Sequence, residues 1–128
     1  MAEALLFDTD VLIEFLRGRP KAAAYFEAVD EEEWYVSAIT VAELYAGLRE
    51  SEEPALREFL TLFEVVDVDG ELARAAGAFR NQYGKTHGTG LADAVIAASA
   101  RSLAARLLTF NVRHYPMVTD ILVPWERG

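Results

Sequence analysis

The amino-acid sequence predicts an α/β fold in which a mostly parallel central sheet of four to five strands has helices on both faces. Short strand patterns alternate with helical patterns along the chain, as in sheets whose strands are joined by helices. The first apolar run, Leu5–Phe7, has no polar alternation, which is typical of a strand buried on both faces. The 128 residues are expected to form one domain, residues 1–128.

The first half of the chain begins with a predicted strand over residues 4–7, followed by a helix that ends near Arg17 at Gly18. Pro20 suits the first turn of a second helix over residues 20–30. Three further elements follow before the midpoint. They are a strand over residues 34–37, a helix over 40–48 and a helix over 54–63.

The second half begins with a strand over residues 65–68 and a helix over 70–82. Residues 84–90 contain three glycines and two cationic side chains, and they are predicted to form a loop. Residues 91–103 form a predicted helix with small apolar residues on nearly every face, which indicates close packing. Two short strands complete the predicted sheet, over residues 106–109 and 121–123.

Composition narrows the functional classes. The chain has no cysteine, so disulfides and thiolate metal sites are excluded. Its start has no basic region typical of a signal peptide and no apolar run approaches a membrane span, so we expect a cytoplasmic protein without membrane contact. The net charge of −9 favours a cationic ligand, metal ions or a basic protein partner, and by itself it argues against nucleic-acid binding.

Four polar residues lie near strand ends or in the first turn of a predicted helix: Asp8, Glu43, Asp93 and Asn111. Each has a purely structural alternative. Asp8 can cap a helix, and Glu43 can complete a capping box with Thr40. Asp93 suits the positive end of a helix dipole, and Asn111 suits a turn.

The surroundings of Glu43 and Asp93 favour a metal site. Both residues lie in otherwise apolar helical segments, and neither has a lysine or arginine at helical spacing. A buried carboxylate must be paired or bind a cation, and converging carboxylates raise each other's pKa. A divalent cation removes that conflict, and ligands that are all oxygen select Mg²⁺ or Mn²⁺.

Four segments then occur in one order along the chain: Phe7–Leu12, Thr40–Leu44, Leu91–Ala98 and Leu108–Tyr115. Together they resemble the PIN-domain ribonucleases, specifically the VapC-type toxins of toxin–antitoxin pairs. The resemblance implies a PIN-like three-layer fold and a metal-dependent endoribonuclease that cleaves RNA. It also implies a homodimer and a small antitoxin protein that blocks the acidic site.

The resemblance assigns roles residue by residue. It places Asp8, Glu43 and Asp93 on the acidic positions, as ligands of Mg²⁺ or Mn²⁺ and as catalytic groups. It places Asn111 where many members carry a fourth acid, so one negative charge is absent there. Thr9 and Thr109 match hydroxyl positions beside the site and would orient carboxylates or a water molecule. Asp10 would cap the helix or lie beside the site, where it would partly make up for the charge absent at Asn111.

Contacts to RNA phosphates need cations near the acidic site. The candidates are Arg113, just after Asn111, and Lys85 and His87 in the glycine-rich segment. A basic antitoxin would suit the negative charge of the chain, and we expect its helix to bind an apolar groove among the helices between residues 20 and 63.

Two other readings stay open. Asp8 and Asp10 after an apolar strand also resemble a haloacid-dehalogenase-like phosphatase or a response-regulator receiver. Both of those need a downstream lysine, for which Lys85 is the one candidate. A non-catalytic acidic protein-binding module is the other alternative, suggested by Asn111. RNA cleavage that requires a divalent cation distinguishes the nuclease from both.

Overall fold

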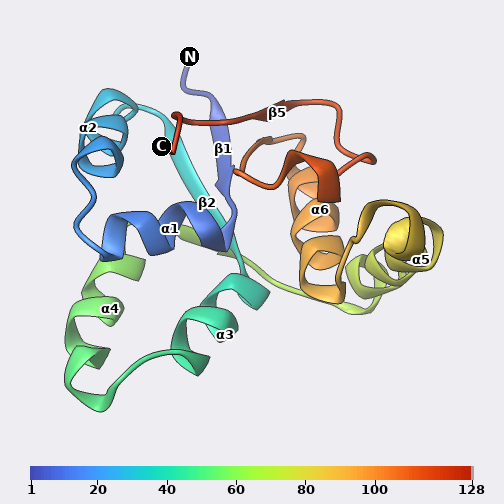
Figure 1. Ribbon diagram of the computed structural model, residues 1–128, viewed down its shortest axis with the longest axis horizontal. Coiled ribbons are helices and arrows are strands. Elements are labelled where there is room, and N and C mark those ends of the chain that lie inside the picture. Colours follow the sequence, from blue (N-terminus) through green and yellow to red (C-terminus); the bar gives the residue numbers. More distant parts are fainter. Residues whose placement is uncertain (128) are drawn as a thin grey trace.

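Five parallel strands form the central sheet of the computed structural model, which describes residues 1–127 (Figure 1). In chain order the strands are β1 (Ala4–Phe7), β2 (Glu33–Ser37), β3 (Glu64–Val66), β4 (Arg106–Leu108) and β5 (Ile121–Leu122). Their order across the sheet is β3-β2-β1-β4-β5, and every neighbouring pair is parallel. The predicted parallel sheet is therefore confirmed.

Helices cover both faces of this sheet. They are α1 (Thr9–Leu16), α2 (Pro20–Ala28), α3 (Ala38–Ala46), α4 (Glu53–Leu60), α5 (Gly70–His87) and α6 (Leu91–Leu103), with short 3-10 helices η1 (Glu50–Glu52) and η2 (Val112–His114). In Figure 1, α1, α2 and α4 lie on one side of β1 and β2, and α6 lies on the other side with α5 outside it. This is the three-layer arrangement that the sequence predicts.

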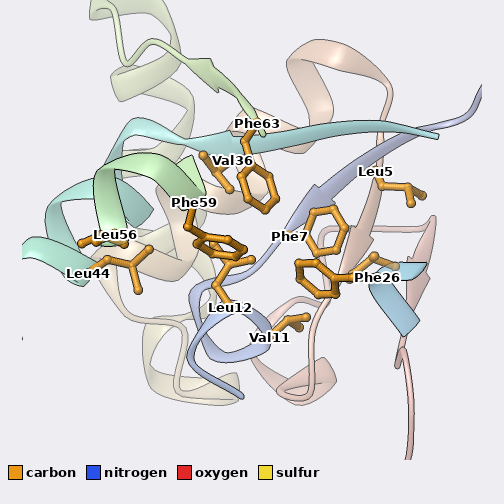
Figure 2. Close-up of a cluster of buried hydrophobic side chains, with 11 residues drawn as sticks. Leu5, Phe7, Val11, Leu12, Phe26, Val36, Leu44, Leu56, Phe59 and Phe63 are labelled. Carbon is orange, nitrogen blue, oxygen red and sulfur yellow. The ribbon is translucent and has the colours of Figure 1, made fainter. Parts of the chain in front are cut away.

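Strand β1 supplies side chains to both halves of the core, as its uninterrupted apolar sequence predicts. Leu5 and Phe7 point into a cluster with α1, α2 and α4, where the Phe7 and Phe26 ring centroids are 5.1 Å apart (Figure 2). Leu6 points to the opposite face and packs with Ile96 of α6. This alternation follows from the two-residue period of a strand. It fixes the end of β1 firmly between the two helical layers.

The connections of the sheet change direction at β1. The chain passes from β1 through β2 to β3 on one side, and then α5 and α6 carry it across to β4 on the other side. The Asp8 backbone N–H donates to the carbonyl oxygen of Leu108 at 2.9 Å, so the ends of β1 and β4 lie side by side. Ligands of open α/β sheets bind at such a switch point, outside the carboxyl ends of the strands.

The structure corrects the prediction of a loop over residues 84–90. Helix α5 continues to His87, and it ends only where Gly88 adopts a left-handed backbone with φ of 68°. A glycine inside a helix costs only about 1 kcal/mol. Helix α5 packs against α6 earlier, through Leu72, Ala76 and Phe79, and it continues through Gly84 at that small cost. Lys85 and His87 therefore lie on the last turn of a helix.

Several other boundaries differ from the prediction by one to three residues, among them those of α3 and α4. Helix α3 begins at Ala38, because the Ser37 hydroxyl oxygen accepts a hydrogen bond from the Ile39 backbone N–H at 3.3 Å. Thr40 is thus inside the helix, and the capping-box interpretation of Glu43 is wrong. Helix α4 ends at Leu60, three residues earlier than predicted.

Candidate active site

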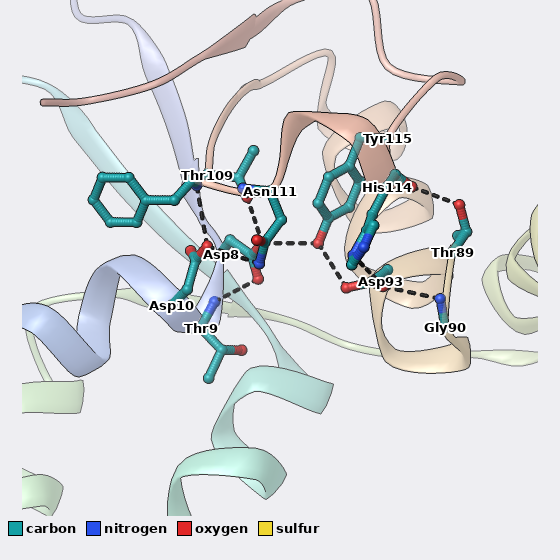
Figure 3. A network of polar contacts seen from close by, with 11 residues as sticks. Asp8, Thr9, Asp10, Thr89, Gly90, Asp93, Thr109, Asn111, His114 and Tyr115 are labelled. Carbon is teal, nitrogen blue, oxygen red and sulfur yellow. Dashed lines mark hydrogen bonds and ion pairs between the residues drawn. The ribbon is translucent and has the colours of Figure 1, made fainter. Parts of the chain in front are cut away.

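Asp8 lies at the switch point of the sheet, where β1 ends and α1 begins (Figure 3). Its side chain is the N-cap of α1, and Oδ1 accepts a hydrogen bond from the Thr9 backbone N–H at 2.7 Å. Oδ2 accepts two more, from the Thr109 hydroxyl at 2.7 Å and the Tyr115 hydroxyl at 2.9 Å. Asp8 therefore caps α1 with Oδ1, while its Oδ2 is held by the Thr109 and Tyr115 hydroxyls.

Burial dominates the electrostatics of Asp8, which is only 4% exposed. Burial raises the pKa of Asp8 to about 7, and the negative charge of Asp10 adds to the rise. The hydrogen bonds from Thr109 and Tyr115 oppose it, because they favour the charged form. The carboxyl group consequently stays partly protonated near neutral pH unless a cation stabilises its charge.

Asp93 lies in the first turn of α6 and faces Asp8 from across the switch point (Figure 3). Its Oδ2 accepts from the Gly90 backbone N–H at 2.9 Å and lies 3.3 Å from Nδ1 of His114. The helix behind it is buried throughout residues 94–100, which confirms the close packing that its small residues predict. Asp93 thus projects from the buried helix as a partly exposed carboxylate.

Tyr115 links the two carboxylates. Its hydroxyl oxygen lies 2.9 Å from Asp8 Oδ2 and 3.3 Å from Asp93 Oδ1, and the residue is only 1% exposed. A phenol has one proton to donate, so it cannot satisfy both charged carboxylates at once. Burial and the charges of Asp8 and Asp93 raise the pKa of Tyr115, so it stays protonated. The group is short of positive charge, which is the condition that a bound cation relieves.

No sequence pattern predicts that Tyr115 belongs to the site. A tyrosine beside a short 3-10 helix carries no sequence signal that its hydroxyl reaches residues 107 and 22 positions away. Only the long connection from β4 through η2 brings it there.

Glu43 differs from the prediction that it is buried in an apolar helix. It is exposed, and the buried face of α3 is formed by Thr40 and Leu44 instead. The Thr9 hydroxyl donates to Glu43 Oε1 at 2.6 Å and lies 3.0 Å from the Thr40 hydroxyl. Because Asp8 and Thr9 are adjacent, Glu43 lies at the outer, α3 side of the acidic group.

Asp10, Thr109 and Asn111 form a polar layer beside Asp8. Asp10 Oδ2 accepts from the Phe110 backbone N–H at 3.0 Å and from Asn111 Nδ2 at 3.1 Å. The Thr109 hydroxyl, which donates to Asp8, accepts from the Asn111 backbone N–H at 3.0 Å. The amide of Asn111 is therefore engaged with Asp10. Within residues 1–127, Asp10 Oδ1 is buried and has no hydrogen-bond partner.

None of the predicted phosphate-binding cations forms an ion pair with an acid of this group within residues 1–127. Arg113 and Lys85 are exposed, and the His87 ring is 2.8 Å from the Thr86 hydroxyl. Helix α5 packs against η2, so its last turn is near His114. One cation that the sequence analysis did not name is closer to the acids: the positive charge of Arg127 lowers the pKa of Asp10, against the burial that raises it.

The residues fit a divalent cation held by two carboxylates. In the part of the chain that the structure describes, no cluster of three His, Cys, Asp or Glu side chains is tight enough to hold a metal ion. Asp8 and Asp93 are nevertheless joined through one hydroxyl, with no lysine or arginine paired to either within residues 1–127. Mg²⁺ commonly uses one or two carboxylates and keeps several waters. Asp8 and Asp93 match that ligand set, and Glu43 can join only from further out.

Comparison with known proteins places this geometry in a family. The PIN domain model matches residues 5–117. The chain is 38% identical to ribonuclease VapC19 of Mycobacterium tuberculosis, over 94% of this chain and 98% of that protein. It is 33% identical to toxin FitB of Neisseria gonorrhoeae, over 95% of this chain and 99% of the toxin.

Solved structures agree with the sequence relatives. A chain of a toxin–antitoxin complex from Klebsiella pneumoniae superposes with a TM-score of 0.80 at 26% identity, covering 96% of this chain and 99% of that one. A chain of FitAcB from Neisseria gonorrhoeae gives 0.76 at 31% identity, with coverage of 96% and 99%. The family model and relatives above 30% identity along nearly the whole chain lead to one conclusion: this protein belongs to the PIN-domain family and resembles its VapC-type ribonuclease toxins.

Proposed function

We propose that this protein is a divalent-metal-dependent endoribonuclease that cleaves RNA phosphodiester bonds and serves as the toxin of a toxin–antitoxin pair. The carrying observation is the pairing of Asp8 and Asp93 through the Tyr115 hydroxyl at the sheet switch point. Relatives named as VapC ribonucleases support the reaction class. The phosphatase alternative requires a lysine among the carboxylates. Lys85 is instead exposed on the last turn of α5.

In this proposal Asp8 and Asp93 would hold Mg²⁺ or Mn²⁺, and the ion would lower the pKa of a water molecule and stabilise negative charge on the leaving oxygen. Thr109 and Tyr115 fix the orientation of the Asp8 carboxylate by donating to Oδ2. Thr9 holds Glu43 at the mouth of the site, where its exposed carboxylate can accept a proton from the attacking water.

The polar layer of Asp10, Thr109 and Asn111 would shape the site and would not supply a further metal ligand. Asn111 is a neutral amide, so the acidic group carries one negative charge fewer than a four-acid site, and its side-chain nitrogen donates to Asp10. We propose that Asp10 keeps Phe110 and Asn111 in place through its Oδ2 oxygen. Arg113, Lys85 and His87 would contact the RNA phosphates on the α6 side of the acids.

The proposed antitoxin partner has a suitable groove. A cavity of about 640 Å³ lies between α1, α3 and the η1–α4 segment. Apolar side chains line it together with one arginine and two glutamates: Ile13, Leu16, Arg17, Glu43, Leu44, Leu48, Glu52 and Leu56. An amphipathic helix with basic flanks fits such a lining. Glu43 belongs to both the groove and the acidic group, so an occupant would also obstruct the site. From the family resemblance we further propose that the protein is a homodimer and cytoplasmic.

Among residues 1–127, no helix combines the length and the apolar character that a membrane span needs.

RNA cleavage by the purified protein tests the proposal. We expect cleavage of single-stranded RNA with Mg²⁺ or Mn²⁺, none in EDTA, and a loss of at least about a hundredfold in Asp93→Asn. Asp30→Asn changes the same charge at an exposed position between α2 and β2 and should cleave normally. A folded parent protein that binds no divalent cation and cuts no RNA would instead support the acidic binding module.

A further inference from the structure

Residues 123–127, which we call the Trp125 arm, run from β5 to α2 and to Phe110, whose backbone N–H donates to Asp10. Three contacts anchor the arm. The Trp125 ring centroid lies 5.7 Å from that of Tyr25 and 5.0 Å from that of Phe110. The Lys21 ammonium donates to the Glu126 carbonyl oxygen at 2.9 Å. The arm is thus fixed to α2 on one side and to the segment after β4 on the other.

Its position brings Arg127 to the acids. The Arg127 guanidinium carbon lies 4.2 Å from the centre of the Phe110 ring, a cation–π contact. Phe110 is joined in turn to the site, because its backbone N–H donates to Asp10 Oδ2 at 3.0 Å. Arg127 therefore stands one residue layer away from Asp10, which neighbours Asp8.

Within residues 1–127, no carboxylate accepts a hydrogen bond from the Arg127 guanidinium or forms an ion pair with it. Ion pairs among the described residues engage Arg19, Arg57 and Arg106, and none includes Arg127. Arg127 is exposed, so its donors face solvent while the Phe110 ring supports one face of its plane. A planar arginine held in this way loses little freedom when it binds a phosphate bidentately.

The net negative charge of the molecule gives the position of Arg127 its importance. A net charge of −9 repels RNA, so binding depends on the few cations close to the acidic pair. Lys85 and His87 lie on the α6 side of the acids, whereas Arg127 lies on the opposite, Asp10 side. A strand whose scissile phosphate lies at Asp8 and Asp93 would then meet positive charge on both sides.

We propose that Arg127 binds the RNA backbone on the Asp10 side of the scissile phosphate, with the Trp125 arm and Phe110 as its support. The inference rests on the proposed ribonuclease function and assigns it a substrate-contacting residue. Its role is to bind the phosphate and not to take part in bond cleavage, so it should affect RNA affinity and leave the chemical step unchanged.

Three variants of the full chain test this assignment: Arg127→Ala, Arg127→Lys and Arg101→Ala. Arg101 is the matched control, because it also lies over an aromatic ring, 5.8 Å from the centre of Phe79. It is located near the far end of α6, eight residues from Asp93, which is about 12 Å along the helix. Cleavage of a short mixed-sequence RNA gives kcat and KM, and fluorescence anisotropy in EDTA gives RNA affinity without cleavage.

For Arg127→Ala we expect KM and the dissociation constant to rise roughly fivefold, and the salt dependence of binding to fall by about one unit of slope. The kcat value should stay within about twofold. Arg127→Lys should recover part of the affinity, and Arg101→Ala should match the parent. Unchanged tryptophan emission will show that the arm remains docked.

Two results would overturn the inference. One is RNA affinity and salt slope in Arg127→Ala equal to those of Arg101→Ala, in a parent protein that cleaves RNA. The other is faster cleavage by Arg127→Ala, which would make Arg127 a counter-ion that competes for the acids. A parent that neither binds nor cleaves RNA would refute the ribonuclease proposal itself, so the two failures are distinguishable.

Discussion

Asp8 and Tyr115 set the chemistry of the site at the level of single residues. Asp8 accepts three hydrogen bonds, which favour its charged form, yet burial still raises its pKa to about 7. The Tyr115 hydroxyl cannot compensate two carboxylates with one proton. Asp8 and Asp93 therefore lack a positive charge that a bound cation would supply. Two predictions follow from this.

The first prediction concerns pH. In the unfolded chain Asp8 titrates near 3.8, and in the folded protein near 7, so between these values the folded state holds a proton that the unfolded state has released. The free energy of unfolding should therefore fall as pH rises through this window, by a few kcal/mol, and remain lower above it. Denaturant unfolding in EDTA at a series of pH values measures this. Asp8→Asn should lack the fall, and parallel curves for the two proteins would contradict it.

The second prediction concerns Tyr115→Phe. Removing the hydroxyl deprives Asp8 of one donor and leaves the two carboxylates with nothing between them, which should lower the free energy of unfolding by about 1–3 kcal/mol without metal. Mn²⁺ binding, measured by calorimetry, should weaken because the carboxylates are less well oriented.

Tyr45→Phe is the control for that variant. It deletes a tyrosine hydroxyl that donates to the Glu53 carboxylate at 2.7 Å on the protein surface, where little change is expected. Equal losses in Tyr45→Phe and Tyr115→Phe would show that the bridge between Asp8 and Asp93 has no special role.

At the level of elements, helices α5 and α6 carry Asp93 and the cations beside it. The boundaries of α6 could be predicted from its high content of small apolar residues, and the structure has the same ones. The end of α5 could not, because a glycine at position 84 occurs in loops as readily as inside a helix, where it costs only about 1 kcal/mol. The start of α3 was missed because Ser37 and Thr40 are both acceptable caps by residue type.

A pair of glycine substitutions in α5 tests how that helix ends. Gly88→Ala places an alanine at a left-handed φ of 68° and should destabilise the protein by about 1 kcal/mol. Gly77→Ala lies inside the same helix with open space around the new methyl group and should stabilise it by about 0.5–1 kcal/mol. Thermal unfolding of both variants should show shifts of opposite sign; shifts of the same sign would contradict the account.

At the level of the whole molecule, the sheet order decides which residues meet. The sequence indicated which acids follow strands, but the order β3-β2-β1-β4-β5 follows from long-range pairing that no local pattern specifies. That order puts β4 beside β1, which brings Thr109 and Tyr115 to Asp8 and leaves Glu43 exposed on the α3 side. The same topology explains why Tyr115 and Arg127 were missed, since both reach the site only through the chain that returns after β4.

The net negative charge of the molecule has two consequences. A net charge of −9 suits a basic partner in the groove between α1, α3 and α4, and it restricts RNA binding to the few cations near the acids. In this proposal the acidic pair itself accepts the scissile phosphate only when a divalent cation offsets Asp8 and Asp93, whereas the flanking cations contact the neighbouring phosphates without it. Cation binding by these two residues is thus the claim on which the nuclease function depends.

Calorimetric titration of the purified protein with Mn²⁺ at pH 8 tests that claim most directly, with Asp8→Asn, Asp93→Asn and the surface control Asp30→Asn measured beside the parent. We predict saturable binding in the parent and in Asp30→Asn, and its loss in both site variants. Mn²⁺ binding that persists unchanged in folded Asp8→Asn and Asp93→Asn would contradict the account.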